Sequence, residues 1–263
     1  MSVVPHFQPK SMKQYVIMMA ILVILAVGSL VASIVSRTSS ADKTRRSASL
    51  QKAKEYHKAD KDPQAIEVLK SALAEEDRLG HAEDPSLVHV LDMLGELLLS
   101  EKRSAEAEAV WRRALALRLK SVGSEHPEVL DTSDKLASAL KAEKKFPEAE
   151  GLLVKSLAKR EEWRESKDDP VLLGSINRLA ELYIAQERWG DAEKHARRAV
   201  AIGRASMGLV PPALADSLRD LGTVLAAQAK DAEAEPLLRR ALAMREQAPD
   251  TAPEVIAAAQ RSL

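Results

Sequence analysis

Small and apolar residues return along the chain with a period of 42 or 43 residues. Each recurrence has an alanine, six intervening residues, and then a small residue followed by an aliphatic one. The five occurrences are Ala65/Ala72/Leu73, Ala107/Ala114/Leu115, Ala149/Ser156/Leu157, Ala192/Ala199/Val200 and Ala234/Ala241/Leu242. A fixed period in this range is typical of stacked supersecondary units, none of which buries its apolar face alone. The pattern therefore predicts a repeat array.

A second apolar pattern precedes the last four of these groups. Its positions recur at i, i+1 and i+4, which marks one side of a helix with a small residue where a neighbour crosses closely: Leu94-Gly95 with Leu98, Leu136-Ala137 with Leu140, Leu179-Ala180 with Tyr183, and Leu221-Gly222 with Leu225. Each repeat is thus predicted to be a helical hairpin. Prolines between the hairpins mark where each first helix begins: Pro85, Pro127, Pro170, Pro212 and Pro253.

The fold class we predict is all-α, an α-solenoid of helical hairpins preceded by one transmembrane helix. The array is expected over residues 46–263, with about five repeats and a C-terminal capping helix that starts near Pro253. Residues 1–14 are predicted to form an N-terminal tail, residues 15–36 the transmembrane helix and residues 37–45 a juxtamembrane linker. Because this linker is short, Arg45 and the next residue, Arg46, are expected to lie near the headgroups and meet anionic lipid.

The transmembrane prediction rests on an uncharged run from Tyr15 to Val35, twelve of whose 21 residues are Ile, Leu or Val. As a helix this run is about 32 Å long, enough to cross a hydrocarbon core. A cleaved signal peptide, with Ser39 and Ala41 at the cleavage site, is the competing interpretation, but the run is longer than a signal h-region. Gly28 and Ala32 form a small-x3-small pattern that lets two spans pack, so a homodimer is possible.

The predicted localisation is a single-pass protein of a bacterial inner membrane. Basic residues are more frequent just after the span than before it, which favours a cytosolic array by the positive-inside rule. A short basic tail ahead of a bulky domain is also typical of proteins that face the periplasm. Both sides stay open.

Composition narrows the function further. Residues 1–62 hold ten Lys/Arg and four Asp/Glu, so the rest of this formally neutral chain carries a charge of −6, which disfavours nucleic acid as a ligand. Absence of cysteine excludes disulfides and thiolate metal sites. His57, His81 and His89 each stand three residues before an aspartate, but the further ligands of a zinc site are missing. No nucleotide-binding glycine loop is present. We therefore predict no enzyme, no metal and no cofactor.

Three strings carry a resemblance to a known family: HPEVLDTSDKLASAL (126–140), INRLAELYIAQERWGDAEKHARRAVAI (176–202) and AEAEPLLRRALAMRE (232–246). They resemble tetratricopeptide repeats (TPRs), specifically the 42-residue variety of kinesin light chains. The first repeat departs from the pattern, since Lys52 stands in place of a leucine. By this register Trp111 falls at a core position, Trp189 packs at a hairpin bend and Trp163 lies on the surface. Pro236 lies near the start of a second helix and is tolerated there if it falls in the first turn.

The resemblance implies that first helices line a concave face on which protein or peptide partners lie. Carried over by register, the exposed positions on this face are His89, Asp92 and Glu96 in the second repeat; Asp131, Asp134, Ser138 and Lys141 in the third; Asn177, Arg178 and Glu181 in the fourth; and Asp216, Arg219 and Thr223 in the fifth. Acids gather at one end, which favours a basic or amide-rich partner segment. The Lys/Asn set that clamps a peptide carboxylate in some TPR proteins is not reproduced, since only Asn177 fits it.

These expectations combine into a membrane-anchored scaffold or assembly factor of an envelope complex, with membrane lipid around residues 15–36. The alternative is a structural subunit held permanently in a large membrane complex, whose groove is filled by a neighbour. Reversible binding of a free peptide would favour the scaffold, and instability of the isolated chain would favour the subunit.

Overall fold

The computed structural model describes residues 42–166, 168–206 and 211–246, which form helices joined by turns without any strand. None of the helices within these ranges is both long and apolar enough to cross a membrane. The predicted span at 15–36 and the predicted capping helix beyond Pro253 lie outside the described residues. The chain divides into two compact parts, residues 1–68 and 69–263.

In the first part, residues 42–58 are helical and are followed by the start of α2 (Asp62–Arg78). The helix therefore already covers the last residues of the predicted linker. Ala53 and Ala65 are fully buried, whereas Lys52 is exposed, in keeping with its departure from the repeat pattern. Arg46 is buried and its neighbour Arg45 pairs with Asp42 at 3.0 Å, so Arg46 is wrong as a lipid contact.

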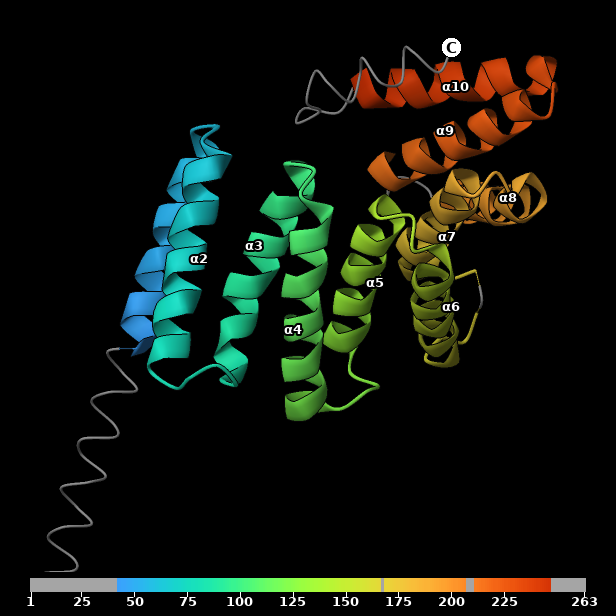
Figure 1. Cartoon of the computed structure of the whole chain (residues 1–263). Helices are drawn as coiled ribbons and strands as arrows, with labels where there is room; N and C mark the ends of the chain where they lie inside the picture. Colours follow the sequence, from blue (N-terminus) through green and yellow to red (C-terminus); the bar gives the residue numbers. More distant parts are fainter. Residues whose placement is uncertain (1–41, 167, 207–210, 247–263) are drawn as a thin grey trace, which may run out of the picture. The chain divides into compact units, whose positions relative to one another are not determined.

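Within the described residues, the second part contains four helical hairpins, which are the second to fifth hairpins of the predicted array (Figure 1). In chain order they are α3 (Val88–Ser100) with α4 (Ser104–Val122), α5 (Pro127–Ala142) with α6 (Phe146–Glu162), α7 (Leu173–Ala185) with α8 (Trp189–Ala205), and α9 (Pro211–Ala227) with α10 (Asp231–Glu246). Single 3-10 turns, η1 (Pro85–Leu87) and η2 (Pro170–Leu172), precede α3 and α7. Each helix packs against its successor, and the first helices α7 and α9 also pack on each other.

Prolines begin the first helices, as the sequence predicted. Pro85, Pro127 and Pro170 occupy the first helical position, where a missing N–H costs nothing and the fixed φ suits a helix. The preceding residue caps each start: the Asp84 and Asp169 carboxylates accept from backbone N–H groups two residues on, both at 2.9 Å. These starts set the register of the second to fourth hairpins.

The bend between the two helices of each hairpin has one left-handed residue that is not glycine. The five are Asp60, Lys102, Lys144, Glu187 and Ala229, with φ between 53° and 60°. The N–H of the following residue returns to the carbonyl five residues earlier, as from Arg103 to Leu98 at 2.8 Å and from Lys145 to Leu140 at 2.8 Å. This is a Schellman ending, which satisfies carbonyls that the end of a helix leaves free.

The alanines of the repeating motif form the centre of the hairpins. Ala107, Ala114, Ala149, Ala192 and Ala199 have no exposed surface. Trp111 is buried at the core position that its register predicted, and its indole lies on Gly95, where an added Cβ would be 2.5 Å from Cε2. Gly222 lies equally close to Leu238. Small residues at these helix crossings therefore let large neighbours fill the core.

Three predictions concern single residues, and one of them differs from the structure. Trp163 is 40 % exposed, as predicted for a surface residue, and Trp189 is half-buried at the first position of α8. Pro236, however, is the sixth residue of α10, outside the first turn. The helix still runs unbroken to Glu246, with one backbone donor fewer, so the condition set for this proline was too strict.

Candidate protein-binding face

Arginines near the ends of three second helices reach the first helix of their own hairpin. Arg118 of α4 holds both carboxylate oxygens of Asp92, at 2.7 and 3.1 Å. Arg160 of α6 lies 2.6 Å from Asp131, and Arg245 of α10 contacts Asp216. Two-point contacts of this kind are among the stronger charged hydrogen bonds. These contacts join the two helices of each hairpin, and Asp131 stays 61 % exposed at its side chain, so its predicted role as a partner contact stays a prediction.

Asp134 is the most deeply placed of these acids. It is 1 % exposed and lies 3.3 Å from both Arg160 and Arg178, the latter on α7 of the next hairpin. Burial raises the pKa of Asp134, although the two arginines oppose that effect. Asp134 is therefore wrong as a partner contact, because two guanidinium groups and the core enclose it.

The fourth hairpin is fastened differently. Asn177 takes the register position of Asp134, and Gly203 takes that of Arg160. Asn177 is buried, donates to the Ala213 carbonyl at 3.0 Å and accepts from the Ser217 hydroxyl at 2.8 Å. Asn177 is thus a second incorrect partner contact, since its amide is used to join α7 to α9.

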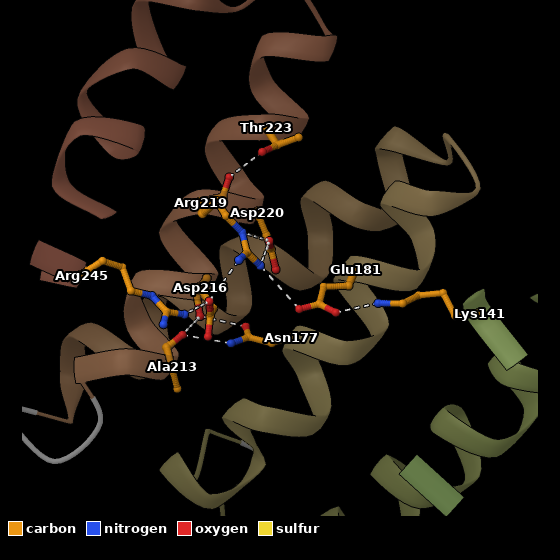
Figure 2. Close-up of polar contacts among 10 residues, drawn as sticks. Lys141, Asn177, Glu181, Ala213, Asp216, Arg219, Asp220, Thr223 and Arg245 are labelled. Atoms are coloured by element: carbon orange, nitrogen blue, oxygen red, sulfur yellow. Dashed lines mark hydrogen bonds and ion pairs between the residues drawn. The ribbon is translucent and has the colours of Figure 1, made fainter. Parts of the chain in front are cut away.

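Ion pairs also connect first helices of neighbouring hairpins. Lys135 of α5 binds Glu96 of α3 at 2.6 Å, and Lys141 of α5 binds Glu181 of α7 at 2.7 Å. Figure 2 shows that Glu181 is shared with Arg219 of α9, which lies 3.5 Å away. Together with the arginine contacts of Asp92, Asp131 and Asp134, these pairs compensate the acids that the sequence places at one end of the face.

Arg219 lies among three carboxylates. It is 2.8 Å from Asp220 and 3.2 Å from Asp216, in addition to Glu181 (Figure 2). Asp220 is 3 % exposed, and its Oδ2 has no hydrogen-bond partner among the described residues. Burial is the main reason that the pKa of Asp220 rises to about 7, against the opposing charge of Arg219.

A pocket of about 380 Å³ opens between the first helices of the second to fourth hairpins. Its wall combines apolar, neutral polar and charged side chains: Glu96, Leu99, Ser100, Trp111, Lys135, Ser138 and Arg178. Such a lining suits an apolar side chain of a partner whose neighbouring polar groups meet the charged rim. We call it the first-helix pocket.

The pocket gathers only part of the predicted site. Glu96 and Arg178 line it together with Ser138, and His89 is exposed at the start of α3 but does not line it. The remaining predicted residues are engaged elsewhere, in the contacts given above: Asp92, Asp131, Asp134, Lys141, Asn177, Glu181 and Arg219. Sequence reasoning missed Lys135 and Leu99, whose positions next to the chosen ones on the same helices were the available signal.

Family comparison decides what this array is. Residues 86–162 and 172–247, more than half of the chain, match the family model described as "Tetratricopeptide repeat". The chain belongs to the tetratricopeptide repeat family. The matched residues cover the hairpins α3/α4 to α9/α10, and the predicted first repeat lies before the match. No curated protein sequence matches the chain.

Solved structures agree with this assignment. A crystal structure of kinesin light chain nearly identical TPR-like repeats from Podosopora anserina is 25 % identical, with a TM-score of 0.62 over 78 % of this chain and 97 % of that one. BtubC (BKLC) from P. vanneervenii is 21 % identical, with a TM-score of 0.54 over 79 % of this chain and 91 % of that one. The TPR fold is consistent with a protein–protein interaction scaffold.

Proposed function

We propose that this TPR chain is a non-catalytic scaffold that holds a partner protein on its first-helix pocket. The observation that carries the proposal is the pocket itself, where Leu99 and Trp111 lie beside Lys135 and Arg178. An apolar floor with a polar rim is the usual anatomy of a protein-docking hot spot. Charge balance along the face argues against the basic segment expected from the sequence, because most of the acids are already paired.

The same proposal includes the membrane. Residues 15–36 anchor the chain in a bacterial inner membrane, so that the array serves an envelope complex as a scaffold or assembly factor. The basis for the anchor is the uncharged run of 21 residues, which is long enough for a span. Basic residues after the run favour a cytosolic array, and a periplasmic array is the other outcome of the topology experiment.

The topology experiment uses the absence of cysteine. Ser124, exposed between α4 and α5, is changed to cysteine, which gives the full chain a single thiol. A membrane-impermeant maleimide is then applied to intact spheroplasts. Protection until lysis is expected for a cytosolic array, and labelling before lysis assigns the array to the periplasm. A chain that leaves the membrane fraction altogether contradicts the anchor.

The binding experiment blocks the pocket with one side chain. Ser100→Trp fills the wall of the first-helix pocket from an exposed position at the end of α3. Ser121→Trp is the matched control, because Ser121 is also exposed and both hydroxyls donate to the carbonyl three residues earlier, at 2.8 and 3.2 Å. Full-length proteins are purified in mild detergent, and bound proteins are quantified by mass spectrometry.

We expect Ser100→Trp to lose a partner that Ser121→Trp retains. Equal recovery by the two variants would place the binding site away from the first-helix pocket. Exchange of that partner for added free partner separates the scaffold from a permanent subunit. A partner that never exchanges, together with a chain that aggregates when stripped of it, would favour the structural-subunit alternative.

A further inference from the structure

At two of the four junctions between consecutive second helices, an acid and an arginine at fixed register positions form an ion pair. The acid stands twelve residues after the first alanine of its motif, and the arginine six residues after the first alanine of the next. Asp77 and Arg113 are joined in this way across α2 and α4 at 3.1 Å, and Glu161 and Arg198 across α6 and α8 at 2.7 Å. An opposite-charge pair is thus the rule at two of these junctions.

The junction of α8 and α10 breaks the rule by placing two cations there. Its register positions are Arg204 and Arg240. Within residues 42–166, 168–206 and 211–246, neither guanidinium forms a hydrogen bond or ion pair. The α4/α6 junction also lacks the acid, but it has the uncharged Leu119 opposite Lys155 and so brings only one cation. Only at α8/α10 do like charges take the place of a pair among the described hairpins.

One of these arginines, Arg204, lines a pocket of about 380 Å³. Its residues come from α8, α9 and α10: Arg197, Val200, Ala201, Arg204, Leu221, Leu225, Glu233 and Leu237. The rim acid Glu233 lies 3.5 Å from Arg197, which also holds Glu193 at 2.7 Å. Arg204 is therefore the one rim charge that the described residues leave uncompensated, above an aliphatic floor.

We propose that this α8/α10 pocket is a second docking site, which takes a partner-protein segment with a carboxylate side chain next to a large aliphatic one. The carboxylate supplies the acid that Asp77 and Glu161 supply at the other junctions and meets Arg204 and Arg240. The aliphatic side chain covers Leu221, Leu225 and Leu237. The site is separate from the first-helix pocket, because second helices and α9 build it.

The probe for this site is a set of three short fluorescent peptides. One alternates leucine with glutamate, the second has lysine for every glutamate, and the third has serine for every leucine. Binding to the full-length protein in detergent is followed by fluorescence anisotropy. We expect measurable affinity, stronger than about 1 mM, for the leucine/glutamate peptide and about tenfold weaker binding for the other two.

Two variants test the assignment to the pocket. Arg204→Glu recreates the acid–arginine arrangement of Glu161 and Arg198. It should weaken binding of the leucine/glutamate peptide about tenfold. Ala201→Trp fills the pocket from an exposed position without a change of charge and should do the same. Lys194→Glu is the matched control, an equal charge reversal at an exposed site on α8 that does not line the pocket.

The outcomes separate clearly, provided that thermal unfolding shows each variant to be folded. Loss of binding in Arg204→Glu and Ala201→Trp, with Lys194→Glu unchanged, supports the proposal. Equal binding by all four proteins overturns it, as does preference for the lysine peptide. If deletion of residues 247–263 alone creates the binding, the chain's own segment occupies the pocket, and the assignment to a partner is wrong. Binding of anionic vesicles in place of the peptide also overturns it.

Discussion

The third and fourth hairpins both pack a first helix on a second one, but different chemistry joins their helices. In the third, Asp134 lies between Arg160 and Arg178, so charge joins its helices to each other and to the next hairpin. In the fourth, the register equivalents Asn177 and Gly203 use neutral hydrogen bonds and close packing. The change is concerted: where the acid becomes an amide, the arginine becomes a glycine. A repeat therefore tolerates a change in one fastening residue when its partner changes with it.

The largest effect is expected when a charged fastener loses one member. Arg118→Leu removes the two-point partner of the largely buried Asp92 and leaves it only Lys135, 3.9 Å away, so the free energy of unfolding should fall by about 3 kcal/mol, the lower end of the cost of breaking a buried pair. Urea denaturation measures the change. Lys120→Leu on the same helix is the control, because its pair with Glu83 is exposed and contributes less than about 1 kcal/mol. Equal losses in both variants would contradict the distinction.

A smaller effect is expected when the fourth hairpin receives the acid of the third without its arginine. Asn177→Asp keeps the shape but loses the donor to the Ala213 carbonyl and buries an unpaired carboxylate. We expect a loss of about 2 kcal/mol at neutral pH. The variant is its own control, because acidification protonates the new carboxyl and should restore part of the stability. A loss independent of pH would mean that the charge is not the cause.

Asp220 tests whether a buried acid in the fifth hairpin needs its charge. Its pKa is about 7 in the folded chain and near 3.8 when unfolded, so the folded state binds more protons between these values. Stability should therefore decrease as pH rises from about 4 to about 7 and level off above that. Asp220→Asn should remove this dependence and be more stable than the parent by about 1 to 2 kcal/mol at about pH 8. Parallel pH profiles for the two proteins would refute the raised pKa.

The smallest effect concerns the close packing that replaces the arginine. Gly203→Ala adds a Cβ 2.7 Å from Leu214 Cδ1 and 3.2 Å from its Cβ, so Leu214 must shift, at a cost of about 1 kcal/mol. Gly151→Ala is the matched control: it is also inside a helix, but its Cβ meets nothing within 4 Å. The control should gain up to about 1 kcal/mol from helix propensity. If the midpoint of thermal unfolding shifts in the same direction for both variants, the close packing of Gly203 on Leu214 does not contribute to stability as described.

The sequence predicted the hairpins well because their core is set by residues that recur at one spacing. The same packing recurs in the repeats: a short side chain such as Ala149 permits a close helix crossing, and a large one such as Trp111 fills the space beside it. The ends of the first helices were harder to predict from sequence, because residues such as Lys102 and Glu187 take the left-handed conformation there in place of the usual glycine.

The candidate face was predicted less well because only the first helices were considered. Whether Asp92 or Asp134 faces a partner depends on an arginine 26 residues away on the second helix. Arg118 and Arg160 recur eleven residues after the alanine that opens the motif, so the signal was present in the same register that identified the hairpins. The pocket, by contrast, depends on side-chain directions that no spacing gives.

The reach of the ion pairs has a consequence for folding. The pairs that fasten the array join residues from 26 to 44 positions apart, within one hairpin or between neighbours. Contacts of such limited range close only short loops, which favours fast formation and lets any hairpin pair act as a nucleus. Force or denaturant should therefore open the array one hairpin at a time from an end. The hairpins with the charged contacts of Arg118 and Arg160 should open later than the fourth hairpin, which Asn177 joins to α9 by neutral hydrogen bonds.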